Sequence, residues 1–301
     1  MRTTSTPSGG GTFSGNVVNI GANRAVKSLN SAHWPDKGET PVKFLLDPGS
    51  YSVGLHFIKG NLTIESADPS NPATIKLPGV FDSSGNAQNP TLSVVGSLTI
   101  RNIKTTGGGD TILLGSSESA NIIAENIKMD AGAIWRGSGA HSAYFKNNAV
   151  YGKPRANVYS SYGGIVGTCV IDHSGTSVPV QQGGRFVNGN PVGEAAIRIM
   201  NVDNLTLKGI KTTPWFYKPG QEWKQDVQIR PRSNLIKVLN CNFYQPDVGD
   251  MLWRDPALPI KRVEFTDCTF VKMPSVTNGV KVIVYTNCKV GGSTINRTLT
   301  F

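Results

Sequence analysis

The sequence predicts an all-β protein that folds as a parallel β-helix, a solenoid wound from a single chain. Three observations predict it: a seven-residue pattern recurs along the chain, its first and third positions are mostly apolar, and its fifth position is nearly always Asn, Asp or Gly. Apolar residues at every second position are typical of a half-buried strand, whereas Asn, Asp and Gly tolerate the backbone of a tight turn. Each copy therefore predicts a strand, a one-residue corner and a second strand, and stacking the units buries their apolar sides.

Three near-copies and five looser copies carry this pattern. The near-copies occupy residues 98–104, 122–128 and 205–211, and the looser copies occupy 143–149, 168–174, 236–242, 263–269 and 283–289. The predicted corner residues at position five are Asn102, Asn126, Asn147, Asp172, Gly209, Asn240, Asp267 and Asn287. We expect these side chains to stack as a ladder parallel to the long axis. Some copies are far apart, and the longer steps indicate inserted loops, where solenoids usually carry their function.

Three segments follow from this pattern. Residues 1–42 form an N-terminal arm and a cap, with a short helix expected around residues 22–31, because the first coil of a solenoid must be covered. Residues 43–290 form the β-helix. Residues 291–301 close the last coil or extend toward a partner. Long loops are expected at 178–193, 212–226 and 244–259, and the second of these is rich in aromatic residues.

The amino-acid composition indicates which classes of partner and which cellular location fit the chain. The net charge is +10 and the pI is about 9.5, which favours an anionic partner such as an acidic polysaccharide, a nucleic acid or an acidic protein surface. The alternative is that the charge serves solubility alone. No stretch of eighteen apolar residues occurs, so we expect no membrane-spanning segment. The first residues lack the apolar core of a secretory signal, so we expect a protein made without a signal peptide, or one whose signal has been removed.

Four cysteines are present, Cys169, Cys241, Cys268 and Cys288, and the last three share position six of the repeat. We expect these three to stack inside neighbouring coils as small apolar groups, with a disulfide between coils as the alternative. Unpaired thiols fit assembly in a reducing compartment. Neither a cofactor nor a metal site is predicted, because the cysteine and histidine spacings match no zinc motif.

The repeat, together with the opening segment 44–53 (Phe-Leu-Leu-Asp-Pro-Gly-Ser-Tyr-Ser-Val), resembles the right-handed parallel β-helix superfamily of pectate lyases, polygalacturonases and phage tailspikes. The resemblance covers about residues 43–290 and points to no specific family. It implies a right-handed coil.

Two groups of residues are candidates for ligand binding. Outward positions four and seven carry mostly cations, namely Arg101, Lys104, Lys128, Lys146, Lys208, Lys211 and Lys289. Stacked about 4.8 Å apart, these cations would repel one another, and an anionic ligand would relieve the repulsion. Lys104, Lys128 and Lys211 are the cations that we expect to bind such a ligand. The alternative is a solvated face that discourages aggregation. The second group is aromatic and lies on the long loops: Trp215, Phe216, Tyr217, Trp223 and Trp253. Its rings either stack on sugars or cover the side of the solenoid.

Candidate catalytic residues rest on two short segments. Residues 169–173 (Cys-Val-Ile-Asp-His) resemble the Trp-Ile-Asp-His segment of pectate lyases, and residues 227–233 resemble the arginine segment that supplies their base. This resemblance implies Arg230 or Arg232 as base or charge clamp, with Asp172, His173 or Glu222 assisting. The chain departs from pectate lyases in three respects: Val170 stands in place of their Trp, the arginine–proline spacing differs, and their calcium-binding carboxylates have no match. Asp172 is alternatively a corner residue of the ladder, and His173 its half-buried neighbour.

Two hypotheses remain open. In the first, the protein is a tailspike-like or decoration-like component of a virion or cell surface, whose rigid solenoid presents loops to a glycan or to a neighbouring subunit. That subunit can be a second copy of the chain, in a homo-oligomer such as a trimer. In the second, it is a polysaccharide lyase or hydrolase that acts on an acidic glycan, secreted after removal of a signal.

Overall fold

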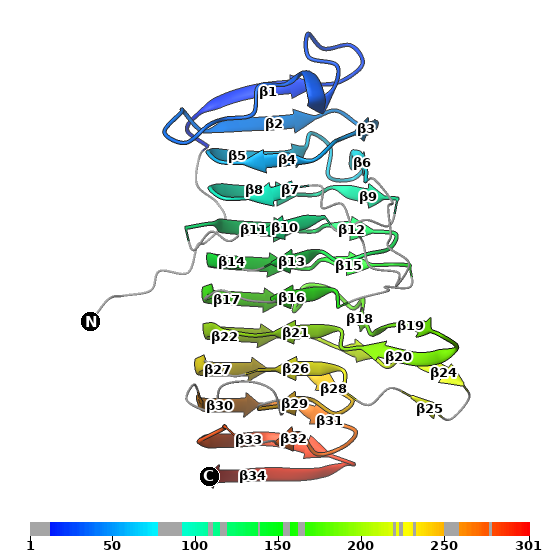
Figure 1. The fold of residues 1–301 in the computed structure, drawn as a ribbon, viewed down its shortest axis with the longest axis vertical. Coiled ribbons are helices and arrows are strands. Elements are labelled where there is room, and N and C mark those ends of the chain that lie inside the picture. Colours follow the sequence, from blue (N-terminus) through cyan, green and yellow to red (C-terminus); the bar gives the residue numbers. More distant parts are fainter. Residues whose placement is uncertain are drawn as a thin grey trace.

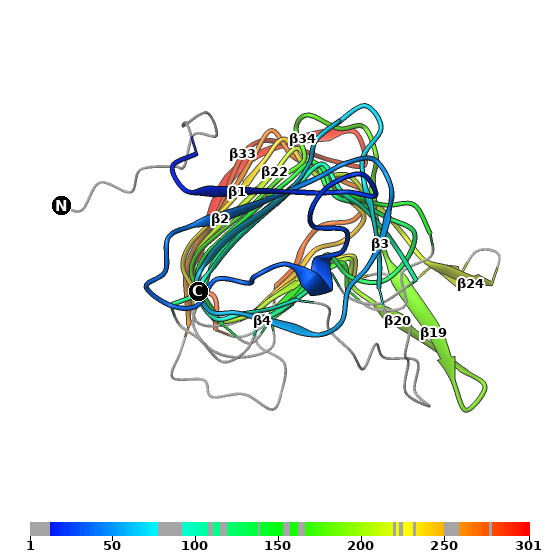
Figure 2. The same cartoon turned by 90° about the horizontal axis from the view of Figure 1, so that it is seen from above.

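The computed structural model describes residues 13–77, 92–107, 111–114, 119–137, 139–152, 157–161, 166–218, 221–222, 225–230, 233–249, 259–276 and 279–301. The predicted fold is confirmed: the chain forms a right-handed parallel β-helix, with strands stacked along the long axis (Figure 1). Seen from above, the coils superimpose around one interior (Figure 2). No helix in these ranges is long and apolar enough to cross a membrane.

Each coil visits three sheets in turn. Sheet A contains β1 (Asn16–Ile20), β2 (Val42–Leu46), β5 (Asn61–Ser66), β8 (Ser97–Arg101), β11 (Asn121–Glu125), β14 (Ala140–Lys146), β17 (Val166–Asp172), β22 (Val202–Lys208), β27 (Ser233–Leu239), β30 (Ile260–Thr266) and β33 (Val282–Val290). Sheet B contains β3 (Ser50–Ser52), β6 (Thr74–Lys76), β9 (Lys104–Thr106), β12 (Lys128–Met129) and β15 (Ala149–Val150). Its side of the solenoid continues with β18 (Val180–Gln181), β23 (Thr212–Thr213), β28 (Asn242–Phe243) and β31 (Thr269–Phe270). Sheet C contains β4 (His56–Ile58), β7 (Leu92–Val94), β10 (Ile112–Leu114), β13 (Trp135–Gly137), β16 (Tyr159–Ser161), β21 (Ile197–Ile199), β26 (Val227–Ile229), β29 (Asp247–Val248) and β32 (Ser275–Val276).

The corner ladder between sheets A and B is confirmed, with one correction. Every predicted corner residue except Asp172 has a positive φ. Asp172 instead pairs in register with Lys146 and Lys208, each of which directly precedes a corner residue. His173 therefore occupies the corner level of its coil, and Asp172 is the last residue of strand β17.

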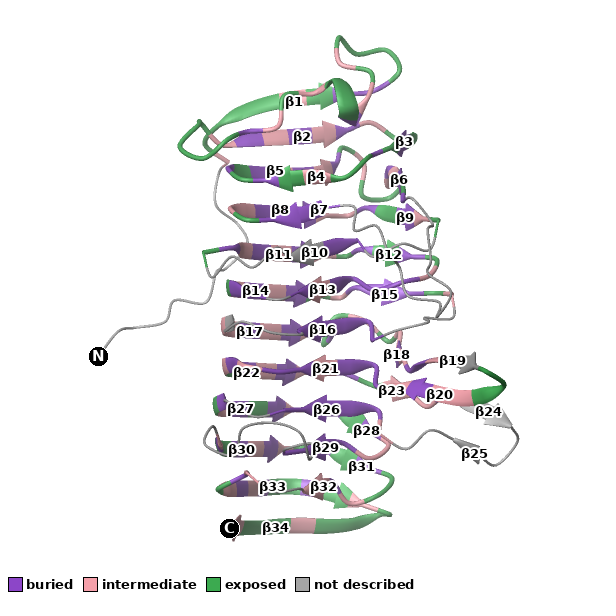
Figure 3. Cartoon of the chain, in the orientation of Figure 1, coloured by how far each residue is buried: buried purple, intermediate pink, exposed green. Residues whose placement is uncertain are grey.

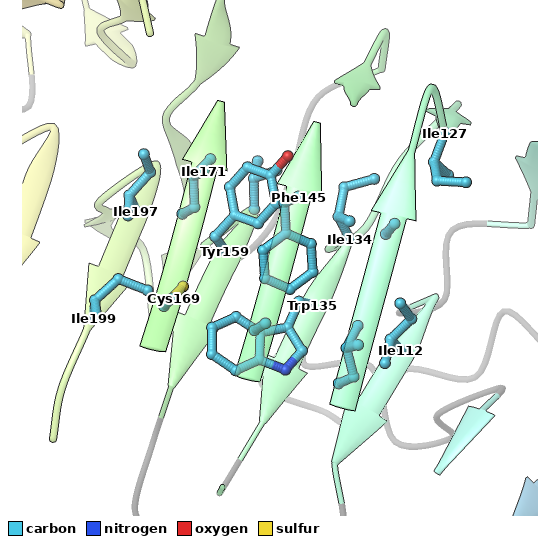
Figure 4. Packing of buried hydrophobic residues seen from close by; sticks show 14 of the residues in the cluster. Ile112, Ile127, Ile134, Trp135, Phe145, Tyr159, Cys169, Ile171, Ile197 and Ile199 are labelled. Atoms are coloured by element: carbon cyan, nitrogen blue, oxygen red, sulfur yellow. The ribbon is translucent and has the colours of Figure 1, made fainter. Parts of the chain in front are cut away.

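The interior is a continuous apolar core, built from positions one and three of sheet A and from the inward residues of the other sheets (Figure 3). At mid-length it holds a run of aromatic rings (Figure 4): the ring centroid of Phe145 lies 5.2 Å from that of Trp135 and 5.1 Å from that of Tyr159. The Tyr159 hydroxyl and Nε2 of His173 share a hydrogen bond of 2.9 Å. His173, expected to be half-buried, is 1% exposed.

The predicted cysteine stack is also confirmed. All four cysteines are buried and none forms a disulfide. The Cys268 thiol lies within hydrogen-bond distance, 3.3 Å, of the carbonyls of Val238 and Thr266, and the neighbouring Cys241 thiol raises the pKa of Cys268 to about 12. Burial raises the pKa of Cys169 to about 12 as well.

The two ends are covered in different ways. The helix expected around residues 22–31 is wrong: only a 3-10 turn, η1 (Leu29–Ser31), forms there, and β1 precedes it. Trp34 follows η1 and stacks on His56, with 3.8 Å between ring centroids. At the other end, β34 (Ser293–Thr300) pairs antiparallel with β33, so it closes the last coil without continuing the parallel pairing.

Two hairpins project from the solenoid on the side of sheet B (Figures 1 and 2). They are formed by β19 (Gly183–Val187) with β20 (Asn190–Glu194) and by β24 (Phe216–Lys218) with β25 (Gln221–Glu222). They come from two of the predicted long loops. Most of the third loop lies outside the described residues.

Candidate functional site

The corner where sheet A turns into sheet B changes its outline along the long axis. Between β8 and β9, between β11 and β12 and between β14 and β15, the chain turns within two residues. The flanking coils turn through longer segments, residues 67–73 after β5 and residues 173–179 after β17. Three short corners between two long ones leave a depression, and a groove of about 400 Å³ lies there. We call it the corner groove.

The floor of the corner groove is made of ladder amides. Asn102, Asn126 and Asn147 hold φ values of 53°, 54° and 51°, a left-handed conformation that Asn tolerates better than most residues. Nδ2 of Asn126 donates to Oδ1 of Asn102 at 2.9 Å, and the backbone N–H of Gly175 donates to Oδ1 of Asn147 at 3.0 Å. Within the described ranges, Nδ2 of Asn102 and Oδ1 of Asn126 make no hydrogen bond, so the floor offers both a donor and an acceptor.

The walls combine apolar and basic groups. Pro69 and Pro72 line one end of the corner groove and Thr176 the other, while Lys128 and Tyr151 border it on the side of sheet B. Tyr151 is 59% exposed, which leaves its ring available to a ligand. Tyr151 is not predictable as a site residue from the sequence, because it belongs to no aromatic cluster and becomes significant only through its neighbours on other coils.

Two lysines make this region basic. Lys104 and Lys128 are direct partners in the parallel register of β9 and β12, so their backbones lie about 4.8 Å apart, and both side chains are exposed. Neither forms an ion pair in the part of the chain that the structure describes. The carboxylate of Asp130, which directly follows β12, accepts a hydrogen bond of 3.3 Å from the backbone N–H of Gly107.

The other predicted row of cations is wrong. At position four of the repeat, Arg101, Glu125, Lys146, Asp172 and Lys208 follow one another in register, so the charges alternate. Nε of Arg101 lies 2.6 Å from Oε2 of Glu125, and Nζ of Lys208 lies 3.3 Å from Oδ2 of Asp172. The prediction of neighbouring cations holds only at position seven, for the pair Lys104 and Lys128, of which Lys128 lines the corner groove.

The predicted ligand-binding lysines therefore separate into two places. Lys104 and Lys128 lie together, whereas Lys211 lies past the long turn that contains Thr176, next to Asn242. Lys211 is exposed but does not line the corner groove.

The described aromatic candidate packs against the solenoid. Trp215 is 4% exposed, and its backbone N–H donates to Oε1 of Gln182 at 2.9 Å. A Cβ atom on Gly184 would lie 2.1 Å from the indole, so glycine is required where the ring covers the base of hairpin β19–β20. Of the two alternatives for this group, Trp215 takes the packing role. Trp223, Trp253 and the side chain of Tyr217 lie outside the described residues.

Arg230 lies on the outer side of sheet C and is inaccessible. Its guanidinium is 2% exposed, with Nη2 at 2.8 Å from Oδ2 of Asp247 and Nη1 donating to the carbonyl of Gly249 at 3.2 Å. Ionic groups this deeply buried require such partners. The sequence analysis missed Asp247, the residue that holds Arg230 in place.

Asp172 and His173 are adjacent in sequence but face different surroundings. The Asp172 carboxylate accepts hydrogen bonds from the backbone and side chain of Ser174 and lies near Lys208, and these groups outweigh burial and lower its pKa. His173 points into the core. The expectation that Asp172 and His173 assist Arg230 is therefore not supported by the geometry, because the three residues do not face a common groove.

The remaining catalytic candidates cannot be placed: Arg232 and the side chain of Glu222 lie outside the described residues. Among all the residues that the structure describes, no group of three or more His, Cys, Asp or Glu side chains is placed to hold a metal ion. One buried carboxylate is structural. Asp226 accepts hydrogen bonds from the Thr212 hydroxyl and from the backbone N–H groups of Tyr244 and Gln245, while burial raises its pKa.

No protein-family model and no curated protein matches the chain. Among solved structures, it is similar to pectin methylesterase from Yersinia enterocolitica, with 14% identity over 90% of this chain and 92% of that one, and a TM-score of 0.43. It is also similar to deglycosylated pectin methylesterase from Aspergillus niger, with 11% identity, coverage of 94% and 88%, and a TM-score of 0.34. A third similar structure is a pectin methylesterase in complex with a hexasaccharide, with 10% identity over 95% of this chain and 92% of that one, and a TM-score of 0.31. Likenesses at this level assign neither a family nor an activity.

Proposed function

We propose that the protein is a glycan-binding β-helix whose corner groove holds a segment of an acidic polysaccharide. The observation that carries the proposal is the pair Lys104 and Lys128, adjacent in register and without an acidic partner among the described residues. Lys128 lines the corner groove beside its floor of amides, and Lys104 lies on the neighbouring strand. Two neighbouring ammonium groups repel each other, and an anionic ligand relieves that repulsion while it gains charge-assisted hydrogen bonds. The net charge of +10 steers such a ligand toward the surface.

The shape of the corner groove favours a polymer over a small anion. Its floor repeats one amide per coil at intervals of about 4.8 Å, so a chain lying along the long axis passes over Asn102, Asn126 and Asn147 in turn and meets the unbonded donor of Asn102 and the unbonded acceptor of Asn126. Tyr151 adds an exposed ring on which a sugar face can stack. This proposal extends to a role on a virion or cell surface, where a rigid solenoid presents the corner groove to a glycan. The described residues favour no catalytic alternative, since Arg230 is buried in an ion pair.

The proposal is tested by measuring binding of polygalacturonate to the wild type and to Lys104→Gln and Lys128→Gln variants by calorimetry. Each substitution removes one charged hydrogen-bond donor, so each should weaken binding about tenfold, and the double variant more. Raising the salt from about 0.05 to about 0.5 M should weaken wild-type binding, because the lysines are exposed to counterions.

Two matched variants serve as controls. Lys281→Gln removes an exposed cation near the C-terminal end, and Lys211→Gln removes the predicted ligand residue that lies beyond the corner groove; both should bind like the wild type. Carboxyl-reduced polygalacturonate, which has the same backbone without the charge, should not compete. If Lys281→Gln weakened binding as much as Lys128→Gln, the attraction would come from overall charge and the assignment to the corner groove would fail.

A further inference from the structure

A second groove, of about 340 Å³, lies on the outer face of sheet A. It crosses four successive strands, β8, β11, β14 and β17, on a face where three columns of outward side chains run side by side, and two of these columns line the groove. The middle column, which forms its floor, consists of Thr99, Ile123, Tyr144 and Val170, paired in register. We call it the sheet A groove. It is separate from the corner groove, whose floor lies around the next turn of the chain.

One border of the sheet A groove is a column of hydroxyl and amide groups. Ser97, Asn121, Ser142 and Thr168 are successive partners in register. The Ser142 hydroxyl donates to Oδ1 of Asn121 at 2.7 Å. The hydroxyls of Ser97 and Thr168 make no hydrogen bond within the described part of the chain, so they remain available to a ligand.

The column of alternating charges runs beside the sheet A groove on the same face, next to the floor column, without lining the groove itself. Arg101 and Glu125 are paired at 2.6 Å, Asp172 and Lys208 are paired at 3.3 Å, and Lys146 stands between the two carboxylates. This neighbouring column therefore has little net charge to neutralise, in contrast to the pair Lys104 and Lys128. A charged ligand would have to break existing pairs, so charge complementarity selects an uncharged one.

Tyr144 provides both an apolar surface and a donor. It is half-buried between Ile123 and Val170 on the floor. Burial and the nearby carboxylates of Asp172 and Glu125 raise the pKa of Tyr144, so the phenol stays protonated at neutral pH. Its ring gives an apolar platform and its hydroxyl a hydrogen-bond donor, the combination that suits a sugar ring.

The backbone excludes a peptide that adds as a strand, because the N–H and C=O groups of these four strands are already paired within sheet A. We propose that the sheet A groove binds an unbranched neutral glycan. Its pyranose rings would lie over Ile123, Tyr144 and Val170, and its hydroxyls would reach the serine–asparagine–threonine column on one side and the carboxylates on the other. This inference goes beyond the acidic-glycan proposal and does not depend on it.

The test is affinity electrophoresis in native gels that contain either hydroxyethylcellulose, a soluble β-1,4-linked glucan, or carboxyl-reduced polygalacturonate. We expect at least one polymer to retard the wild type, with an effect that persists at high salt because no charge is involved. Tyr144→Ala should weaken the association about tenfold or more, whereas Tyr144→Phe, which keeps the ring, should weaken it much less.

The variants separate the two grooves and control for folding. Tyr144→Ala should still bind polygalacturonate, which shows that the solenoid is intact, and the Lys104→Gln, Lys128→Gln double variant should still be retarded by the neutral polymer. Absence of retardation by both polymers would overturn the inference, as would retardation that Tyr144→Ala leaves unchanged. A lower oligomeric mass of Tyr144→Ala by light scattering would also overturn it, because the face would then be a contact between copies of the chain.

Discussion

Among single residues, His173 links the corner ladder to the core. The other corner residues are small and polar and stay near solvent, whereas the His173 side chain turns inward to meet the Tyr159 hydroxyl. Its Nδ1 has no hydrogen-bond partner among the residues that the structure describes. Burial lowers the pKa of His173 to about 4, so the ring is neutral in the folded protein at physiological pH.

This environment makes stability depend on pH. The folded pKa of about 4 is below the unfolded value of about 6.5, so the unfolded chain binds the extra proton first as the pH falls. The contribution of His173 is full above pH 6.5 and is lost as the pH falls toward 4, by about 3 kcal/mol at most. We expect the difference in unfolding free energy between the wild type and His173→Gln, measured by urea denaturation, to shift by that amount across this window. A difference that is constant with pH would show that the ring is already solvated in the folded state.

Gly209 shows why one corner departs from Asn. Its φ of 63° is one that Asn also adopts, so conformation alone does not require glycine. A Cβ atom there would lie 2.6 Å from the backbone of Ser174, in the long turn of the preceding coil. Close approach between coils, together with the backbone conformation, therefore explains the glycine.

At the level of strands, the alternating charges of sheet A stabilise neighbouring coils. We expect Glu125→Lys, which would place three cations in consecutive strands, to lower the free energy of unfolding by about 1–2 kcal/mol. Added salt should recover part of the loss by screening. The double variant Arg101→Glu, Glu125→Arg restores the pair between positions 101 and 125. It should recover only part of the stability, because the new arginine at position 125 then adjoins Lys146 and the new glutamate at position 101 adjoins Glu65. Thermal unfolding at two salt concentrations tests this; no destabilisation by Glu125→Lys would mean that these pairs contribute nothing.

The sequence was sufficient for the repeated elements and insufficient for relations between them. Asn102, Asn126 and Asn147 were predictable as corners because each follows an apolar–polar alternation within its own copy. The corner at His173 was misplaced by one residue, because Asp172 is the better turn former and only the register with Lys146 and Lys208 decides. The helix at 22–31 failed because a weak local pattern gave way to packing over the first coil.

The grooves were harder to predict, for a related reason. The corner groove arises from the lengths of five consecutive corners, and Tyr151 contributes to it only through its position beside other coils. The charge alternation that closes sheet A to an anionic ligand is visible in the sequence only after each position four is aligned correctly. One misaligned residue at Asp172 hid its pairing with Lys208.

For the molecule as a whole, stacking makes each coil depend on its immediate neighbours. In such a solenoid, stability is the sum of coil and interface contributions, so an end coil with one neighbour opens more readily than a central one. At the C-terminal end, the last coil is covered by β34, most of whose residues are exposed (Figure 3). Cys288, Cys268 and Cys241 lie in successive coils from that end, and Cys169 lies near the middle.

These cysteines can report the order of opening. All four thiols are buried, so alkylation by iodoacetamide requires local or global unfolding. In moderate denaturant, we expect Cys288 to be labelled first, then Cys268 and Cys241, with Cys169 last, as read by mass spectrometry of timed samples. Fraying from the β34 end produces this order because each opened coil exposes the next. Equal labelling rates at all four positions would instead show that the solenoid opens as one cooperative unit. Packing between neighbouring coils would then stabilise the last coil as strongly as the central ones, although the last coil has only one parallel neighbour.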